Sequence, residues 1–339
     1  MSSDTLKTLF HPFEVDVLPL PGADTRALFL GAEPGFRLPT GFDATLHLVQ
    51  GFRPDFRQLI ASGQTVSPQV DGEGFDLALV LAGRHRGLNE LRIAEAIERV
   101  GRGNLIVVAG GKEDGIASLR KRAGELLTLG DHLSKHHGQA FWFHRPADGS
   151  AADQLRAANP SLLVEERYET APGMFSFDRV DAGSRFLSEQ LPADIKGQVA
   201  DFCAGWGFLS VAIAERSAGL VGLDLYEADH AALQAAGRTL ARLMPNLPVK
   251  KFWHDLAGEP VVERYDVIVM NPPFHRGRAA EPELGSTIIR AAAKALKPGG
   301  RLFMVANRQL PYEPVLARVF SSHAEIARNE AFKVFQARR

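Results

Sequence analysis

The sequence has a single cysteine, Cys203, among its 339 residues. This excludes an internal disulfide and a zinc site built from several cysteines. No apolar run approaches the roughly 20 residues that a bilayer-spanning helix needs, and residues 1–10 lack the apolar core of a signal peptide. No acid and no third histidine directly adjoins the histidine pair at 136–137. We therefore expect a cytoplasmic protein with no membrane segment and no metal site.

A charge excess of either sign is also absent, because 39 Lys and Arg residues stand against 40 Asp and Glu residues, for a formal net charge of −1. A chain with this balance carries no global electrostatic footprint for nucleic acid, although local basic clusters can still contact phosphates. Hydrophobic residues make up 45% of the chain, which is ample for buried cores. A length of 339 residues favours two domains.

The tetrapeptide Asn271-Pro-Pro-Phe is the most informative motif that the sequence does contain. It directly follows the apolar run 265–270, and such a run before turn residues is typical of a buried parallel strand. Asn271 should then lie at the carboxyl end of a strand, where open α/β sheets bind ligands. The Asn271 side-chain carbonyl and the Pro272 carbonyl can accept hydrogen bonds from one planar amino group, and Phe274 can stack on a flat ring. A turn without function is the alternative, because Asn-Pro is a common turn signal.

A glycine-rich turn precedes this motif, between a predicted strand at 197–200 and a predicted helix at 208–216. It spans residues 201–207 and includes Asp201, Cys203, Gly205 and Gly207. A strand, a glycine turn and a helix in this order bring backbone N–H groups close to a nucleotide-like ligand. The turn alone could equally bind the dinucleotide of an oxidoreductase, but such an enzyme has no use for Asn-Pro-Pro-Phe at the fourth strand.

Two acids follow the next predicted strands. Asp224 comes after the apolar run 220–223, about 20 residues beyond the glycine turn, and is placed to bind ribose hydroxyls. Asp255 comes after the run 249–253 and is placed to accept a hydrogen bond from an adenine amino group. An Asp at a strand end is also a common cap or turn former. Four such pieces in order nevertheless indicate a nucleoside site beside an amine-binding motif.

With these motifs in order, the region from about residue 172 to the C-terminus resembles the class I S-adenosylmethionine-dependent methyltransferases, in the branch that methylates amino groups. Further segments are similar to the bacterial rRNA guanine-N2 methyltransferases of the RsmC and RlmG type. These segments are Pro172–Ser176 followed by Asp181–Ser184, Asn-Pro-Pro-Phe continued by His275, and Val305–Asn307 followed by Leu310–Tyr312. One departure is Cys203, which stands where the family pattern has glycine and adds a Cβ where the backbone nears the cofactor.

The resemblance implies an enzyme that methylates the exocyclic N2 amine of a guanosine in ribosomal RNA, with small-subunit RNA favoured and S-adenosylmethionine as the cofactor. The residues expected to hold the amine and its base are Asn271, Pro272 and Phe274. The expected cofactor contacts are Asp181, Asp201, Cys203, Gly205, Gly207, Asp224 and Asp255. The expected substrate contacts beside the motif are Pro273, His275 and Arg276, with a general-base role for His275 as the alternative.

Other functions remain compatible with the same motifs. Enzymes with Asn-Pro-Pro-aromatic also methylate adenine N6 and the glutamine amide of release factors, and a large-subunit guanine would need the same chemistry. A non-catalytic RNA-binding or assembly protein that retained the fold is a further alternative. The intact Asn271, Asp224 and Asp255 argue against that alternative.

The first half of the chain looks like a degenerate copy of the second. Residues 266–277 match 76–87, residues 301–307 match 104–110, and the glycine turn matches residues 29–35, all in the same order. Chance similarity between short strands is the alternative. We read the pattern as an internal duplication of one α/β domain.

The site residues differ between the two copies. Phe29 replaces Asp201, Glu33 replaces Gly205, and Leu81 replaces Asn271. Leu81 cannot accept a hydrogen bond through its side chain, and Glu33 places a charge in the turn. We therefore expect the first copy to keep the fold, to bind no cofactor and to serve in RNA recognition or in structure. Its predicted RNA contacts are Arg84 and Arg86, which lie in the segment matched to the Asn-Pro-Pro-Phe loop.

The predicted fold is therefore α/β, with two tandem Rossmann-like methyltransferase domains. The degenerate domain is expected at 1–155 and the catalytic domain at 165–339, and the polar segment 147–172 contains the expected linker. The catalytic domain should have a seven-stranded doubly wound sheet. We expect an antiparallel hairpin over residues 324–337 to close it.

Overall fold

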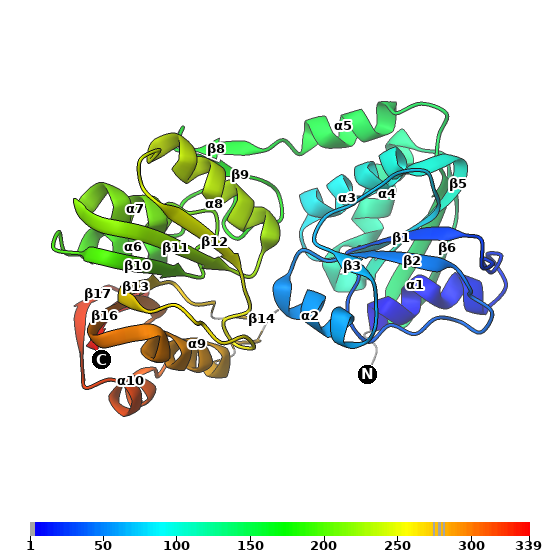
Figure 1. Cartoon of the computed structure of the whole chain (residues 1–339). Coiled ribbons are helices and arrows are strands. Elements are labelled where there is room, and N and C mark those ends of the chain that lie inside the picture. The colour runs from blue at the N-terminus through cyan, green and yellow to red at the C-terminus, as the bar shows by residue number, and fades with distance from the viewer. Residues whose placement is uncertain (1–3, 274, 277–278, 281) are drawn as a thin grey trace. The chain divides into compact units, whose positions relative to one another are not determined.

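The computed structural model describes residues 4–273, 275–276, 279–280 and 282–339. The chain forms two compact units (Figure 1). The first unit comprises Met1–Ser161 and Ala171–Gly173, and the second comprises Leu162–Thr170 and Met174–Arg339. The sequence placed the two domains at 1–155 and 165–339. The boundary between the two units lies between these ranges, except that Ala171–Gly173 belong to the first unit.

The first unit is built on a seven-stranded sheet with the order β3-β2-β1-β4-β5-β7-β6. The first five strands in this order are parallel, whereas β7 pairs antiparallel with β5 and with β6. The strands are β1 (Arg26–Leu30), β2 (Thr45–Val49), β3 (Val66–Ser67), β4 (Phe75–Ala82), β5 (Val100–Gly111), β6 (Leu129–Lys135) and β7 (Gly138–His144). The helices are α1 (Asp4–Glu14), α2 (Arg53–Ala61), α3 (Arg86–Arg99), α4 (Ile116–Leu126), α5 (Ser150–Ala158) and a 3₁₀ turn at Lys112–Asp114.

Alternate residues of the central strands enter two separate cores of the first unit. Leu28 and Leu30 of β1 pack in a core that includes α3 and α4, whereas Ala27 and Phe29 pack in a core that includes α1. Both faces of the sheet are therefore buried, which explains why the parallel strands read as continuous apolar runs in the sequence.

The second unit has the same strand order, β12-β11-β10-β13-β16-β18-β17. Its sheet strands are β10 (Lys196–Phe202), β11 (Gly219–Glu227), β12 (Val249–Trp253), β13 (Tyr265–Met270), β16 (Leu296–Asn307), β17 (Ser322–Arg328) and β18 (Phe332–Arg338). Two short hairpins add β8 (Leu162–Val164) with β9 (Tyr168–Thr170) and β14 (His275–Arg276) with β15 (Ala279–Ala280). The helices are α6 (Ala182–Gln190), α7 (Phe208–Arg216), α8 (His230–Leu243), α9 (Pro282–Ala295) and α10 (Glu313–Val319).

The shared strand order confirms the predicted fold class, two doubly wound α/β sheets of the same kind. The predicted C-terminal hairpin is confirmed as well, because β17 and β18 pair antiparallel and β18 pairs antiparallel with β16. The hairpin closes one edge of the sheet, and the edge strand β17 is exposed along most of its length.

The strand registers support two of the three sequence matches between the copies. Phe202 lies opposite Met270 in the second unit, and Leu30 lies opposite Val80 in the first. The sequence matches pair Phe202 with Leu30 and Met270 with Val80, so the two registers agree with both matches. The glycine turn and the Asn271 position therefore have equivalent places in the two sheets.

The third match is wrong by one residue. Arg301 lies opposite Val267 in the second unit, but Leu105 rather than Asn104 lies opposite Leu77 in the first. Both strands are long apolar runs, so sliding one against the other by a residue changes their similarity little. Only the side-chain alternation across the sheet distinguishes the two alignments.

Candidate active site

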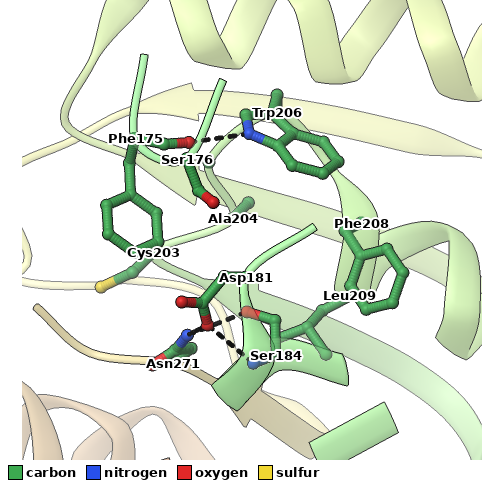
Figure 2. A pocket seen from close by; sticks show the side chains of 11 residues that line it. Phe175, Ser176, Asp181, Ser184, Cys203, Ala204, Trp206, Phe208, Leu209 and Asn271 are labelled. Carbon is green, nitrogen blue, oxygen red and sulfur yellow. Dashed lines mark hydrogen bonds between the residues drawn. The ribbon is translucent and has the colours of Figure 1, made fainter. Parts of the chain in front are cut away.

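A pocket in the second unit lies at the carboxyl ends of β10 and β13 (Figure 2). It is lined by Phe175, Ser176, Asp181, Ser184, Cys203, Ala204, Gly205, Trp206, Phe208, Leu209 and Asn271. Three distant stretches of sequence meet here because parallel strands end at the same edge of a sheet. They are the segment leading into α6, the glycine turn after β10, and the start of the Asn-Pro-Pro motif after β13.

The glycine turn has three residues in the left-handed region, Cys203 with φ 61°, Gly205 with φ 55° and Gly207 with φ 95°. A Cβ on Gly207 would lie 3.0 Å from the Cβ of Ala236 on α8, so glycine allows close helix packing there. A Cβ on Gly205 would meet nothing within 4 Å, so the space beside that peptide is open to a ligand. Cys203 holds a side chain in a conformation that favours glycine, which stores backbone strain at the pocket.

Asp201 is fully buried near the end of β10, at the start of this turn. One carboxylate oxygen accepts a hydrogen bond from Ser210 Oγ at 2.6 Å, and the other has no hydrogen-bond partner among the described residues. Burial, with a smaller contribution from nearby Glu227, raises the pKa of Asp201 to about 7. A buried acceptor without a partner beside an open turn is a position that a ligand's donor would satisfy.

Glu227 contacts the glycine turn, and the sequence reasoning did not single it out. It is the last residue of β11; its Oε2 accepts from the Gly205 backbone N–H at 2.8 Å and its Oε1 accepts from the Asp229 N–H at 2.8 Å. Burial raises the pKa of Glu227 to about 7. The missed signal is the length of the strand, which runs on through Leu225 and Tyr226 before it reaches an acid.

The prediction that β11 ends at Asp224 is wrong, because the strand continues for three more residues. Asp224 is 2% exposed, and its two oxygens accept hydrogen bonds from Tyr265 Oη at 2.8 Å and from Gln198 Nε2 at 3.1 Å. The carboxylate therefore lies inside the sheet's own packing. The structure does not bring Asp224 to the pocket, and Glu227 occupies the strand end expected for it.

Asp255 follows β12, as predicted, and stabilises its own turn. Its Oδ1 accepts from the Ala257 and Gly258 backbone N–H groups, each at 3.1 Å. This is the turn-forming role that the sequence left open for it. Its contact with an adenine amine stays a prediction.

Asn271 lies at the carboxyl end of β13, as its motif predicts. Its Nδ2 group donates to Asp181 Oδ2 at 2.9 Å and to Ser184 Oγ at 2.8 Å, which Figure 2 draws as dashed lines. Its Oδ1 is buried and has no hydrogen-bond partner within the described part of the chain. The amide therefore presents one unsatisfied acceptor beside the glycine turn.

Phe175 and Trp206 complete the pocket and were not predicted as site residues. The Trp206 indole N–H donates to the Phe175 backbone carbonyl at 2.8 Å, which ties the segment before α6 to the glycine turn. The Phe175 side chain is 67% exposed at the pocket. A signal was present, since both residues belong to segments that the sequence singled out.

The rest of the Asn-Pro-Pro-Phe loop is described in part. Pro272 is buried and Pro273 is exposed. Phe274, predicted to stack on the target base, lies outside the described residues. His275 and Arg276 form β14, and their side chains also lie outside what the structure describes.

Arg84 and Arg86 belong to the first unit, in and just after the connection between β4 and α3. This connection corresponds to the one that carries the Asn-Pro-Pro motif in the second unit. Arg84 Nε lies 3.6 Å from Asp114 Oδ1, and Arg86 Nε lies 3.6 Å from Glu90 Oε1. The Arg86 side chain is 78% exposed, so it keeps most of its surface in solvent despite this pairing.

The described residues contain neither a metal-binding cluster nor a helix that could cross a membrane. Within residues 4–273, 275–276, 279–280 and 282–339, no cluster of three or more His, Cys, Asp or Glu side chains could hold a metal ion. No helix in the same ranges is long and apolar enough to cross a membrane.

A family model described as "Methyltransferase small domain" matches residues 165–336. Two curated relatives are named "Ribosomal RNA small subunit methyltransferase C". The protein of Erwinia tasmaniensis is 38% identical over 177 residues, which cover 52% of this chain and 50% of that protein. The protein of Serratia proteamaculans is 37% identical over 177 residues, which cover 52% of this chain and 49% of that protein. The chain thus spans about half the length of the curated relatives it matches.

One solved structure is similar along nearly the whole chain. It is described as the T. thermophilus 16S rRNA N2 G1207 methyltransferase (RsmC) in complex with AdoMet and guanosine. The match covers 99% of this chain and 91% of that one, with a TM-score of 0.78 and 23% sequence identity. This likeness shows that the two chains share a fold across both units.

Proposed function

The chain belongs to the methyltransferase small domain family, and from this premise we propose that it transfers a methyl group from S-adenosylmethionine to the N2 amine of a guanosine in ribosomal RNA, with small-subunit RNA as the favoured substrate. The observation that carries the proposal is the buried, unpartnered Oδ1 of Asn271 in a pocket that also contains the glycine turn. The names of the curated relatives and of the solved structure support the choice of ribosomal RNA and guanine.

The second unit fits the proposed cofactor on three observations. The space beside Gly205 is open, Asp201 Oδ1 is a buried acceptor without a partner among the described residues, and Glu227 stands at the end of β11. A carboxylate at the end of the second strand is the group that binds ribose hydroxyls in such folds. We therefore assign ribose binding to Glu227 in place of Asp224, and we retain Gly205, Gly207, Cys203 and Asp201 as the residues around the rest of the cofactor.

Bound at this turn, S-adenosylmethionine would supply an electrophilic methyl group on a positively charged sulfur that leaves as a neutral thioether. The task of the chain is to make the target amine a nucleophile. Two acceptors, Asn271 Oδ1 and the Pro272 carbonyl, can take the two amine hydrogens and leave the nitrogen lone pair free to attack. A new N–C bond forms as the S–C bond breaks, and the resulting ammonium loses one proton to water.

Positioning and fixed dipoles supply the rate in this scheme. Orienting the amine removes the entropy cost of an encounter between two freely moving groups. The two carbonyl acceptors also stabilise the positive charge that develops on the nitrogen. No enzyme nucleophile is required, and the Cys203 thiol is a poor one because desolvation raises its pKa well above the ordinary value.

The target base must leave its stack to reach such a pocket. We propose that Phe274 stacks on the base, and that Pro273, His275 and Arg276 contact the RNA around it. We further propose that the first unit binds no cofactor and contacts RNA through Arg84 and Arg86, of which Arg86 is the more exposed.

The test is methyl transfer from labelled S-adenosylmethionine to ribosomal subunits that lack this modification, followed by nucleoside analysis. The expected product is N2-methylguanosine in small-subunit RNA. Label in large-subunit RNA would keep the chemistry and change the target. Label in N6-methyladenosine or in a release factor would show that the substrate is not guanosine. The absence of label in all fractions would contradict the enzymatic proposal.

A further inference from the structure

The amide group of Asn271 has a defined orientation. Both hydrogens of its Nδ2 are used, one toward Asp181 Oδ2 at 2.9 Å and one toward Ser184 Oγ at 2.8 Å (Figure 2). Its Oδ1 is therefore turned away from these two residues, and it is the atom that remains buried without a partner in the described structure.

The reverse orientation is excluded by charge. A flipped amide would place the Asn271 oxygen against the Asp181 carboxylate, and two acceptors at hydrogen-bond distance repel each other. Ser184 could adapt, because a hydroxyl both donates and accepts, but an ionised carboxylate only accepts. Asp181 thus selects the orientation, and Ser184 adds the second acceptor that completes it.

The four residues Asp181–Ser184 form one local structure around this contact. Asp181 is the N-cap of α6, and its Oδ2 accepts from the Ser184 backbone N–H at 2.8 Å as well as from Asn271. A Cβ on Gly183 would lie 3.1 Å from Asp181 Oδ2 and 3.1 Å from a ring carbon of Phe332, so the glycine leaves the carboxylate in place. Both polar side chains of this segment, Asp181 and Ser184, therefore accept a hydrogen bond from Asn271.

We propose that Asp181 and Ser184 are positioning residues for methyl transfer: they hold the Asn271 amide so that Oδ1 faces the target amine. The inference rests on the proposed function, and it changes the role of Asp181 from a cofactor contact to a support for the catalytic side chain. A hydrogen bond from an amide to a carboxylate also polarises the amide and makes its oxygen a stronger acceptor. Asp181 would therefore increase the strength of the Asn271 acceptor as well as fix its direction.

Ser184→Ala gives the cleanest test, because the backbone N–H that Asp181 caps is retained and only the hydroxyl is lost. We expect kcat to fall about tenfold, which is the effect of losing one well-placed hydrogen bond, while calorimetric affinity for S-adenosylmethionine stays unchanged. Ser184→Thr, which keeps a hydroxyl, should restore most of the rate.

The matched control is Ser188→Ala on the same helix. The Ser188 hydroxyl donates to the Arg185 carbonyl at 2.7 Å one turn further along α6, and it does not line the pocket. Its loss should leave kcat within about twofold of the parent, since a local hydrogen bond of this kind acts on helix stability alone. A fall in kcat equal to that of Ser184→Ala would assign both effects to α6 stability and would overturn the proposal.

Asp181 is tested with two substitutions. Asp181→Asn keeps an oxygen acceptor and a good helix cap but removes the charge, whereas Asp181→Ala removes the acceptor and the cap. We expect losses in kcat of about tenfold for Asp181→Asn and about a hundredfold for Asp181→Ala, since the second variant also releases the amide to rotate. A greater loss of cofactor affinity than of kcat in either variant would return Asp181 to the cofactor site and overturn the inference.

A double-mutant cycle separates positioning from any direct role of Ser184. In the Asn271→Ala background, Ser184→Ala should cause no further loss in single-turnover rate, because the group that Ser184 holds is already absent. An equal tenfold loss in both backgrounds would show that Ser184 acts independently of Asn271. Full activity of Asn271→Ala itself would contradict the proposed function instead, so the two failures give different results.

Discussion

The two units share one sheet topology but differ in the residues that stand at the glycine turn. Cys203 corresponds to Gly31 and Gly205 to Glu33, and each of Cys203 and Gly31 has a positive φ. The strand registers also place Gln50 at the position of Glu227, because Leu30 pairs with Val49 as Phe202 pairs with Tyr226. Leu81 takes the position of Asn271. The turn therefore keeps a positive φ at Gly31 and Gly35, as at Cys203 and Gly207, whereas Gly205 has a positive φ and Glu33 does not.

In the first unit the turn is filled by side chains of the unit itself. Arg92 donates from Nη1 to the Leu81 carbonyl at 2.7 Å, and the same atom lies 2.5 Å from where a Cβ on Gly31 would be. Gln50 Nε2 donates to the Ala32 carbonyl at 2.8 Å. Two backbone carbonyls at this edge of the first sheet thus meet an arginine and an amide of the same unit.

The comparison separates fold from function at single positions. A doubly wound sheet with a left-handed turn after its first strand accommodates either set of residues, so the sheet itself carries no chemistry. The open space beside Gly205 and the unpartnered acceptors at Asn271 and Asp201 distinguish the second unit, within the described part of the chain. Substitutions that exchange residues between the units test this view directly.

Asn271→Leu gives the second unit the residue of the first and should have the largest effect. Leucine cannot accept a hydrogen bond from the amine, so kcat should fall by about 1,000-fold, as for the loss of a main electrostatic contact to the reacting group. Affinity for S-adenosylmethionine should change by less than about threefold, because the cofactor's proposed contacts are elsewhere. Single-turnover kinetics and calorimetry on the same preparation measure both. Equal losses of rate and affinity would remove the distinction between amine and cofactor residues.

Gly205→Glu introduces the residue of the first unit into the open side of the turn. The side chain would enter the space that is empty beside Gly205, and glutamate would also be strained at φ 55°. We expect cofactor affinity to fall by about a hundredfold or more, because the cofactor would have to displace a charged side chain from the site. The protein should still fold, with about 1 kcal/mol lost to backbone strain. Retained affinity in calorimetry would show that the cofactor does not approach this turn.

Glu227→Gln introduces the Gln50 side chain and tests a pH dependence. Burial raises the pKa of Glu227 from its ordinary 4.5 to about 7, so the free protein holds a proton there below pH 7. Ribose hydroxyls donate best to the ionised carboxylate, so wild-type affinity should rise between about pH 6 and 8. In the variant this rise should be reduced, and affinity at pH 8 should be about tenfold lower. An unchanged pH profile would remove Glu227 from the cofactor site.

The same substitution has a stability signature. Because the folded-state pKa of Glu227 is raised, the folded protein binds more protons than the unfolded one between about pH 4.5 and 7. The contribution of Glu227 to the free energy of unfolding is therefore lost as pH rises through this window and is constant above it. Glu227→Gln should gain stability relative to the wild type over the same window in urea titrations. A gain that appeared only above pH 8 would contradict the assignment.

The sequence predicted the fold class and the elements that meet at the pocket because these depend on local patterns. Apolar runs, turn residues and their order are enough to place Asn271 and the glycine turn at one sheet edge. The choice between Asp224 and Glu227 depended on where β11 ends. The strand continues past Asp224 to Glu227, and Asp224 is buried in the sheet, where it accepts a hydrogen bond from Tyr265. Such a partner across the sheet is not visible in a local window.

Side chains that act through another residue were equally hidden in the sequence. Asp181 and Ser184 lie about 90 residues before Asn271 in the chain, at separations of 90 and 87, and meet it only because α6 begins beside the end of β13. Trp206 likewise meets the Phe175 carbonyl through folding. Resemblance marked the segments that contain these residues, but their contacts had to come from the structure.

Cys203→Gly restores the residue of the first unit and should have the smallest effect. Cys203 has φ 61°, close to the 71° of Gly31, and only glycine adopts this conformation without cost. Relief of the left-handed strain is worth about 1 kcal/mol, and the greater freedom of glycine in the unfolded chain offsets part of it. We therefore expect the free energy of unfolding to rise by somewhat less than about 1 kcal/mol in urea titrations, with kcat unchanged. If the free energy of unfolding instead fell by as much, the packing energy of the Cys203 thiol in the pocket wall would exceed the strain energy of its backbone. That packing would then explain why the second unit has cysteine where the first has glycine.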